Sequence, residues 1–288
     1  MGMSEIKEAW QYQTLYFGHD RSERYSVLII DNRGIGGSDK PISRYSTELM
    51  AAEVIQVLDH VGWTAQRDVH LIGISLGGMI SQKVAQAIPE RIKSLTLLST
   101  SAGMFRTMPT LRECRDWMSV LSPGSEETQI ANMIHLLFPD DWLAKLDTDG
   151  DPSPSTTSRF KLPPEMGGKP AYFESNWQRY QAWEMSKRRR KGLMPLSGEL
   201  CQAVAVVTHR MSDRELRAMA DAVGRERILV VHGTEDRLLS VEHGHHFIDV
   251  IQPAQGIIIE GMGHACIMER SMFINKTLEE SIEVWNKL

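Results

Sequence analysis

Short apolar runs alternate with amphipathic stretches along most of the 288-residue chain. The runs predict strands that are covered on both faces, because a strand with one wet face alternates apolar and polar residues. The predicted strands cover 27–30, 69–74, 94–99, 227–231 and 256–260. Apolar residues spaced by three and four predict helices over 5–17, 47–61, 76–88, 213–223 and 241–251. This alternation predicts an α/β fold, with a mostly parallel sheet and helices on both faces.

The strand–helix alternation stops between residues 105 and 208. Helical patterns appear there at 110–121, 125–137, 171–185 and 199–209, separated by loops at 151–158 and 162–164. We therefore divide the chain into a core of residues 1–104 and 209–288 and an inserted helical segment of residues 105–208. Trp142, Trp177 and Trp183 in this segment are candidates for the wall of a hydrophobic substrate pocket. For most of its large apolar residues we favour a place in a small core within the segment.

The junction of one predicted strand and helix carries the sequence Gly73-Ile74-Ser75-Leu76-Gly77. A serine on so sharp a turn is held in a strained conformation with its hydroxyl exposed, which is typical of a nucleophile. Glycines flank it because side chains there would collide across the turn. The amide of Leu76 starts the following helix, and we expect it to donate to an oxyanion formed at Ser75.

Three more segments follow predicted strands: DNRGIGGSD at 31–39, HGTED at 232–236 and GMGH at 261–264. Together with the serine turn, they resemble the α/β-hydrolases over most of the chain outside 105–208. The resemblance implies that the inserted segment is a helical lid over the pocket. It also implies a catalytic triad in the order Ser, Asp, His, for which the candidates are Ser75, Asp236 and His264.

In such a triad His264 acts as the general base for Ser75, and Asp236 fixes the tautomer of the imidazole. Two neighbours are rival candidates, because His232 also follows a strand and Glu235 adjoins Asp236. The family's acid can also follow the strand that ends near Ser99, but residues 99–105 contain no carboxylate. This absence favours Asp236.

The sequence departs from the family at its beginning. In the α/β-hydrolases a hairpin and a third strand ending in His-Gly come first, and the residues after His-Gly supply the second oxyanion amide. Such a strand would end just before Met1, so the first strands are absent from this sequence. We expect the sequence to begin at an internal methionine of a longer protein. Residues 1–3 are then the tail of the oxyanion loop, and Met1 is a weaker oxyanion candidate.

A serine at the turn favours acyl transfer to water over the chemistry of relatives that build an ester on a carboxylate nucleophile. We expect hydrolysis of an ester, lactone or thioester of a small to medium hydrophobic compound. Two alternatives within catalysis stay open, cleavage of a carbon–carbon bond in a diketone and a biosynthetic polyketide hydrolase or cyclase. A third alternative is a homologue without activity that binds a small molecule in the same pocket.

Composition limits the partners of the protein. A net charge of −5 gives no electrostatic reason to expect nucleic acid, and no apolar run reaches the ~18 residues of a membrane span. Three distant cysteines and the clustered His243, His245 and His246 lack a metal-binding spacing, and the loop at 31–39 lacks the Gly-x-Gly-x-x-Gly pattern of a dinucleotide site. We therefore expect no metal and no cofactor.

Two short signals remain. The basic run 187–191 favours a solvated turn over an anion site, given the acidic chain around it. The sequence suggests a cytoplasmic protein, since the cysteines indicate a reducing compartment and no signal peptide is evident. The final residues Asn286-Lys287-Leu288 differ by one residue from a peroxisomal address, for which an ordinary helix end is the simpler interpretation.

Overall fold

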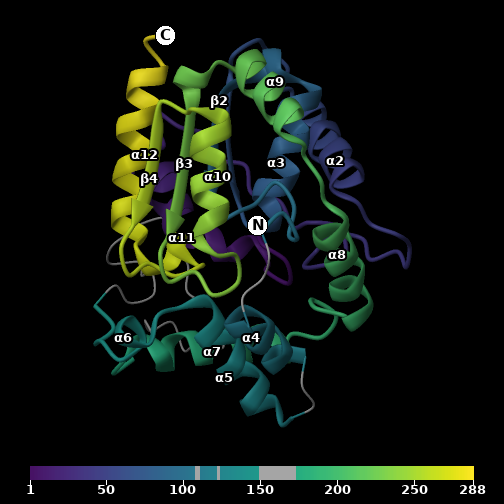
Figure 1. Cartoon of the computed structure of the whole chain (residues 1–288), viewed down its shortest axis with the longest axis vertical. Helices are drawn as coiled ribbons and strands as arrows, with labels where there is room; N and C mark the ends of the chain where they lie inside the picture. Colours follow the sequence, from purple (N-terminus) through teal and green to yellow (C-terminus); the bar gives the residue numbers. More distant parts are fainter. Residues whose placement is uncertain (108–110, 122–123, 149–172) are drawn as a thin grey trace.

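A computed structural model of the chain describes residues 1–107, 111–121, 124–148 and 173–288. Its sheet has four parallel strands in the spatial order β1-β2-β3-β4 (Figure 1). They are β1 (Val69–Ile74), β2 (Ile92–Leu98), β3 (Ile228–Gly233) and β4 (Gln255–Ile259). These elements confirm four of the predicted strands and the predicted parallel sheet.

Helices cover both faces of the sheet, as predicted (Figure 1). One face carries α2 (Thr47–His60), α3 (Leu76–Ala87), α9 (Asp213–Val223) and α10 (Val241–Ile251). The other face carries α12 (Ser271–Trp285) and the helical N-terminal segment, which consists of η1 (Lys7–Trp10), α1 (Gln11–Gln13) and η2 (Thr14–His19). Shorter turns are η3 (Pro89–Arg91), η5 (Arg225–Arg227) and α11 (Cys266–Glu269).

Local signals in the sequence set the ends of these helices. The Ser46 hydroxyl accepts a hydrogen bond from the Leu49 N–H at 3.2 Å and caps α2. Ser212 and Glu215 form a reciprocal capping box at the start of α9. Gly62, with a φ of 78°, ends α2 in a conformation that only glycine adopts easily.

The prediction of a strand at 27–30 is wrong for this chain. No ladder forms there, although Leu28 packs against the core on one face of the sheet and Ile29 against the core on the other. The side chains of residues 27–30 therefore point alternately to the two faces, as in a strand. β1 is an edge strand of the sheet, and among the described residues no strand pairs with its outer side. Without a neighbouring strand among the described residues, the segment forms no ladder.

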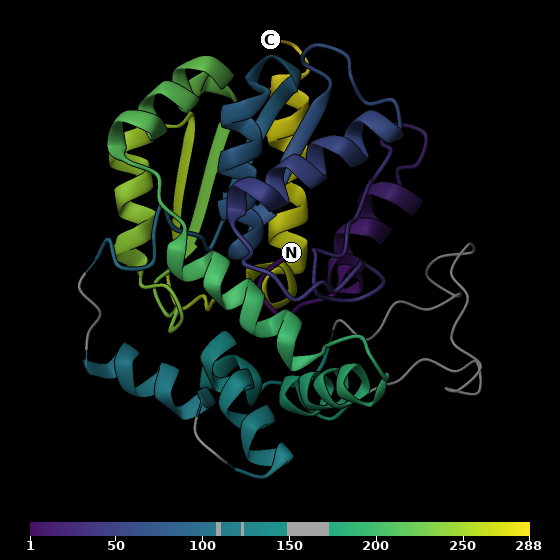
Figure 2. The ribbon, with the colours of Figure 1, turned by 90° about the vertical axis from the view of Figure 1, so that its right-hand side faces the viewer.

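Between β2 and α9 the described residues form five further helices. They are α4 (Leu111–Leu121), α5 (Glu126–Leu137), α6 (Asp140–Leu143), α7 (Asn176–Arg189) and α8 (Leu196–Thr208). Figures 1 and 2 show α4 to α7 gathered across the carboxyl ends of the strands. The predicted loops at 151–158 and 162–164 lie outside the described residues. The boundaries of the lid at 105 and 208 stay a prediction.

The basic run at 187–191 is not wholly solvated, which corrects our interpretation of it. The Lys187 side chain is buried, and its ammonium lies 2.7 Å from Glu5 Oε2 and 2.6 Å from Glu184 Oε1. Burial raises the pKa of Glu5, and Lys187 opposes this rise. The ion pair joins helix α7 to the N-terminal segment, a contact that neighbouring residues in the sequence do not reveal.

We expect Lys187→Met to destabilise the protein by about 3–5 kcal/mol, because it leaves two buried carboxylates without their cation. Urea unfolding measures this difference. Lys191→Met is the matched control, since Lys191 is an exposed member of the same basic run; its effect should stay within about 0.5 kcal/mol. Equal stabilities of the two variants would contradict a structural role for the ion pair.

No helix among the described residues has the length and apolar character required to cross a membrane.

Candidate active site

Ser75 lies at the sharp turn between β1 and α3, as the sequence predicts. Its φ of 55° and ψ of −124° are unfavourable for a residue with a Cβ. The surrounding backbone enforces this conformation. The Ser75 N–H donates to the Leu98 carbonyl at 3.0 Å, and the Ser75 carbonyl accepts from Thr100 Oγ1 at 2.7 Å. The strain is therefore held by contacts between two neighbouring strands.

The glycines around Ser75 are required by close approach. A Cβ on Gly73 would collide with the carbonyl oxygen of Gly77 across the turn. A Cβ on Gly77 would lie 2.8 Å from the Met1 nitrogen, and one on Gly2 would lie 3.7 Å from Ser75 Oγ. Residues 1 and 2 therefore pack directly against the serine turn.

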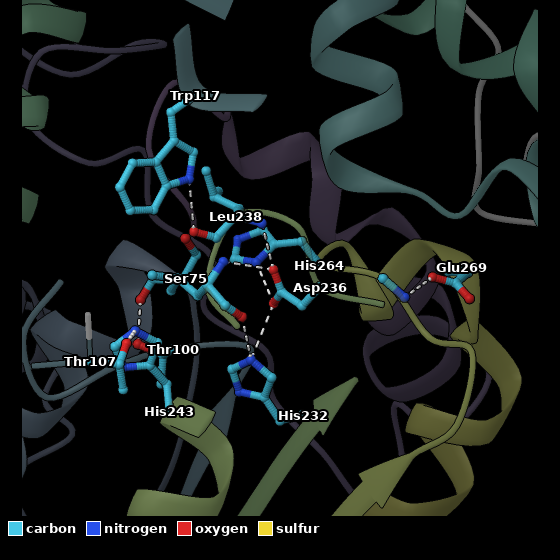
Figure 3. Close-up of polar contacts among 12 residues, drawn as sticks. Ser75, Thr100, Thr107, Trp117, His232, Asp236, Leu238, His243, His264 and Glu269 are labelled. Atoms are coloured by element: carbon cyan, nitrogen blue, oxygen red, sulfur yellow. Dashed lines mark hydrogen bonds and ion pairs between the residues drawn. The ribbon is translucent and has the colours of Figure 1, made fainter. Parts of the chain in front are cut away.

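The aspartate and histidine of the predicted triad form a buried hydrogen-bonded pair. His264 Nδ1 lies 2.7 Å from Asp236 Oδ2 (Figure 3). The other carboxylate oxygen accepts from the N–H groups of Leu238 and Leu239 at 2.9 and 2.8 Å. Burial alone would raise the pKa of Asp236, but His264 and His232 outweigh it and hold that pKa below its usual value. Asp236 therefore stays ionised at neutral pH and is fixed at both oxygens.

The parallel sheet brings the three predicted residues to the same edge. Ser75 follows β1, Asp236 follows β3 and His264 follows β4. Because carboxyl ends of parallel strands meet at one edge, loops far apart in the sequence converge there. Helices α4 to α7 lie across this edge (Figure 1).

The rival histidine, His232, also touches the aspartate. His232 Nε2 lies 3.3 Å from Asp236 Oδ2 and 2.8 Å from the Leu239 carbonyl, to which it donates. Figure 3 shows His232 and His264 approaching Asp236 from different sides. His232 belongs to β3 itself and is buried, so its contacts with Asp236 and Leu239 suit support of the loop that follows β3.

Comparison with known proteins establishes the family. Residues 8–271 match the family model described as the alpha/beta hydrolase fold. The chain belongs to the α/β-hydrolase family. This confirms the resemblance drawn from the serine turn and the three loops.

Among relatives, 3-oxoadipate enol-lactonase 2 of Acinetobacter baylyi is 33% identical over 93 residues, which are 32% of each chain. Lipase 1 of Psychrobacter immobilis is 25% identical over 86% of this chain and 65% of its own length. The chain spans less than half the length of several curated relatives that it matches. The solved structure of a meta-cleavage product hydrolase from Pseudomonas fluorescens is 15% identical, with a TM-score of 0.68 over 98% of this chain and 87% of its own. That likeness shows the fold alone.

The two oxyanion candidates of this α/β-hydrolase lie next to the serine turn. Leu76 is the first residue of α3, so its N–H is at the helix start, where the helix itself provides no acceptor. The Met1 carbonyl accepts a hydrogen bond from Asn32 Nδ2 at 3.0 Å, which fastens residue 1 to the loop at 31–39. Their donation to an oxyanion stays a prediction.

The three lid tryptophans occupy different environments. Trp142 is buried between Phe138 and Tyr180, with ring centroids 5.0 and 5.5 Å away. Trp177 packs on the ring of His135 at 4.9 Å, and the buried Nε1 of Trp183 has no hydrogen-bond partner among the residues that the structure describes. The contacts of Trp142 suit the lid's own core, and a role in binding substrate stays a prediction for all three.

A fourth tryptophan links helix α4 to the loop after β3 that carries Asp236, a contact for which the sequence contains no signal. Trp117 Nε1 donates to the Leu238 carbonyl at 3.2 Å (Figure 3). A polar cavity of about 210 Å³ lies in the same region. Its lining residues are Arg115, Asp116, Ser119, Asn132, His135, Leu136, Asp140 and Arg237. Ser75 does not line this cavity.

The clustered histidines are engaged in other contacts. His243 Nε2 lies 3.1 Å from Thr107 Oγ1, and His246 Nε2 lies 2.9 Å from Asp213 Oδ1. Among the residues that the structure describes, no group of three or more His, Cys, Asp or Glu is placed to hold a metal ion.

Proposed function

We propose that this α/β-hydrolase is a serine hydrolase that cleaves an ester, lactone or thioester of a small to medium hydrophobic acid. The observation that carries the proposal is the 2.7 Å pair of His264 and ionised Asp236 at the edge where the strained Ser75 turn also lies. Buried, oriented groups of this kind make a weak hydroxyl reactive.

The reaction follows from the roles of the three side chains. Ser75 Oγ attacks the carbonyl carbon of the substrate while His264 Nε2 takes its proton. Asp236 accepts from Nδ1 and stabilises the imidazolium. The N–H of Leu76, with that of Met1, binds the oxyanion. His264 then protonates the leaving group, which departs and leaves Ser75 acylated. In the second half of the reaction, His264 takes a proton from water as the water attacks the acyl carbon, and it returns this proton to Ser75 Oγ as the acid is released.

The relatives support hydrolysis of acyl compounds. The enol-lactonase and the lipase are named for cleavage of a lactone and a lipid ester, and both match this chain in sequence. Epoxide hydrolase A of Mycobacterium tuberculosis is 23% identical over 97% of this chain. A serine at position 75, where the carboxylate nucleophile of that chemistry is required, weighs against epoxide opening here.

We expect a fluorophosphonate probe to label the protein at Ser75, with the site located by mass spectrometry of the labelled peptide. A panel of p-nitrophenyl esters of increasing acyl length, a lactone, an acyl thioester and a vinylogous diketone then identifies the reaction. Turnover of an acyl substrate supports the proposal. Cleavage of the diketone alone indicates a carbon–carbon hydrolase, and absence of labelling with saturable ligand binding indicates a homologue that only binds; both contradict it.

A further inference from the structure

A buried glutamate lies behind the turn that carries the candidate base. Glu269 ends α11, five residues after His264, and its side chain is fully buried. Its Oε2 accepts a hydrogen bond from the Gly263 N–H at 2.7 Å (Figure 3). The triad leaves this carboxyl group without a role, because Asp236 already contacts the imidazole.

Burying the carboxyl group of Glu269 costs folding free energy, so its place inside the protein calls for an explanation. Burial raises the pKa of Glu269 to about 7, against smaller opposing effects of the Gly263 N–H, Arg270 and Lys145. Arg270 Nε lies 3.2 Å from Oε1, but its side chain is partly exposed and compensates only in part. An uncompensated buried carboxyl destabilises the folded state, whereas its backbone contact with Gly263 bears directly on the catalytic turn.

The His264 turn is fixed on both sides of the histidine. A Cβ on Gly263 would lie 2.7 Å from the Leu137 carbonyl and 3.1 Å from Glu269 Oε2, so the turn is wedged between the lid and Glu269. The following residue, Ala265, donates its N–H to the same Leu137 carbonyl at 3.2 Å. Glu269 therefore supplies the acceptor on one side of His264, and the end of lid helix α5 supplies it on the other.

We propose that Glu269 is a positioning residue, whose buried oxygen holds the Gly263 N–H and thereby sets the direction of the His264 ring. The inference rests on the proposed function, because it assigns Glu269 to the turn of the proposed base. A base must reach both the serine and the aspartate. A displacement of 1 Å of such a group lowers the rate by about 100-fold.

The test compares Glu269→Ala with Glu269→Gln. Glutamine keeps a carbonyl oxygen for the Gly263 N–H, and alanine removes it. We expect Glu269→Ala to lower kcat by about 10- to 100-fold with little change in KM, and Glu269→Gln to keep kcat close to that of the wild type. Leu58→Ala is the control for lost stability, since Leu58 is buried in α2 and touches no proposed catalytic group. Its kcat should be unchanged when all variants are assayed equally far below their own Tm.

A kcat of Glu269→Ala equal to that of Leu58→Ala overturns the proposal, as does a glutamine variant as slow as the alanine variant. If the wild-type protein is inactive, the proposed function fails, and the role of Glu269 is tested by a readout that does not depend on activity. The low-field proton NMR signal of His264 Nδ1–H, assigned by its loss in His264→Ala, reports the bond to Asp236. Positioning by Glu269 predicts that this signal broadens or is lost in Glu269→Ala and persists in Glu269→Gln, and its persistence in both overturns the inference.

Discussion

Replacing Ser75 with alanine is expected to lower kcat by about 10⁵- to 10⁶-fold and to abolish fluorophosphonate labelling. The hydroxyl forms the acyl-enzyme, so its removal takes away the covalent route and leaves only binding and oxyanion stabilisation. Alanine keeps the Cβ that makes the φ of 55° unfavourable, so the strain at the turn is unchanged. The variant should therefore unfold within a few degrees of the wild-type Tm.

Ser81→Ala is the matched control for this substitution. Ser81 is buried in the same helix, α3, and its hydroxyl lies against Gly73. Its kcat should remain within a few-fold of the wild type. Equal activities of Ser75→Ala and the wild-type protein, measured on the same ester, would remove Ser75 from the mechanism.

The sequence predicts those parts of the fold that obey local rules. Gly73 and Gly77 mark the serine turn because backbone atoms approach where a side chain would stand. Ser46 and Ser212 mark helix starts because their hydroxyls satisfy free N–H groups nearby. Local sequence patterns also predict that each triad candidate directly follows a strand.

Contacts between distant segments escape such reasoning. Residues 27–30 have the composition of a strand, but a strand needs a neighbour, and no strand of the described residues pairs with them. Lys187 resembles its solvated neighbours in sequence, but it is buried and pairs with Glu5, 182 residues away, as well as with the nearby Glu184. Glu269 is also one carboxylate among many until its bond to Gly263 is seen. The structure at these positions depends on contacts between segments far apart in the sequence, which hydrophobic periodicity does not predict.

Asp236→Asn should lower kcat by about 10⁴-fold, the second-largest effect that we expect of a single substitution. The carboxylate accepts from His264 Nδ1 and leaves Nε2 free to take the serine proton. An asparagine can present its N–H₂ group instead, which favours the tautomer with the proton on Nε2, where a base is needed. Steady-state kinetics on the best substrate of the panel measure the loss, which should fall on kcat.

Glu235→Gln is the control, because Glu235 is the adjacent carboxylate that the sequence alone leaves as a rival. It should retain kcat within a few-fold, and the opposite ranking of the two variants would transfer the acid's role to Glu235. The pH dependence of stability gives a second readout for Asp236→Asn. The pKa of Asp236 is lower in the folded state than the ordinary value of 3.8, so its ionisation stabilises the fold above that pH, and this contribution is lost as the pH falls through the folded-state pKa. Asp236→Asn removes that dependence, so stability should fall less steeply with acid in this variant than in the wild type.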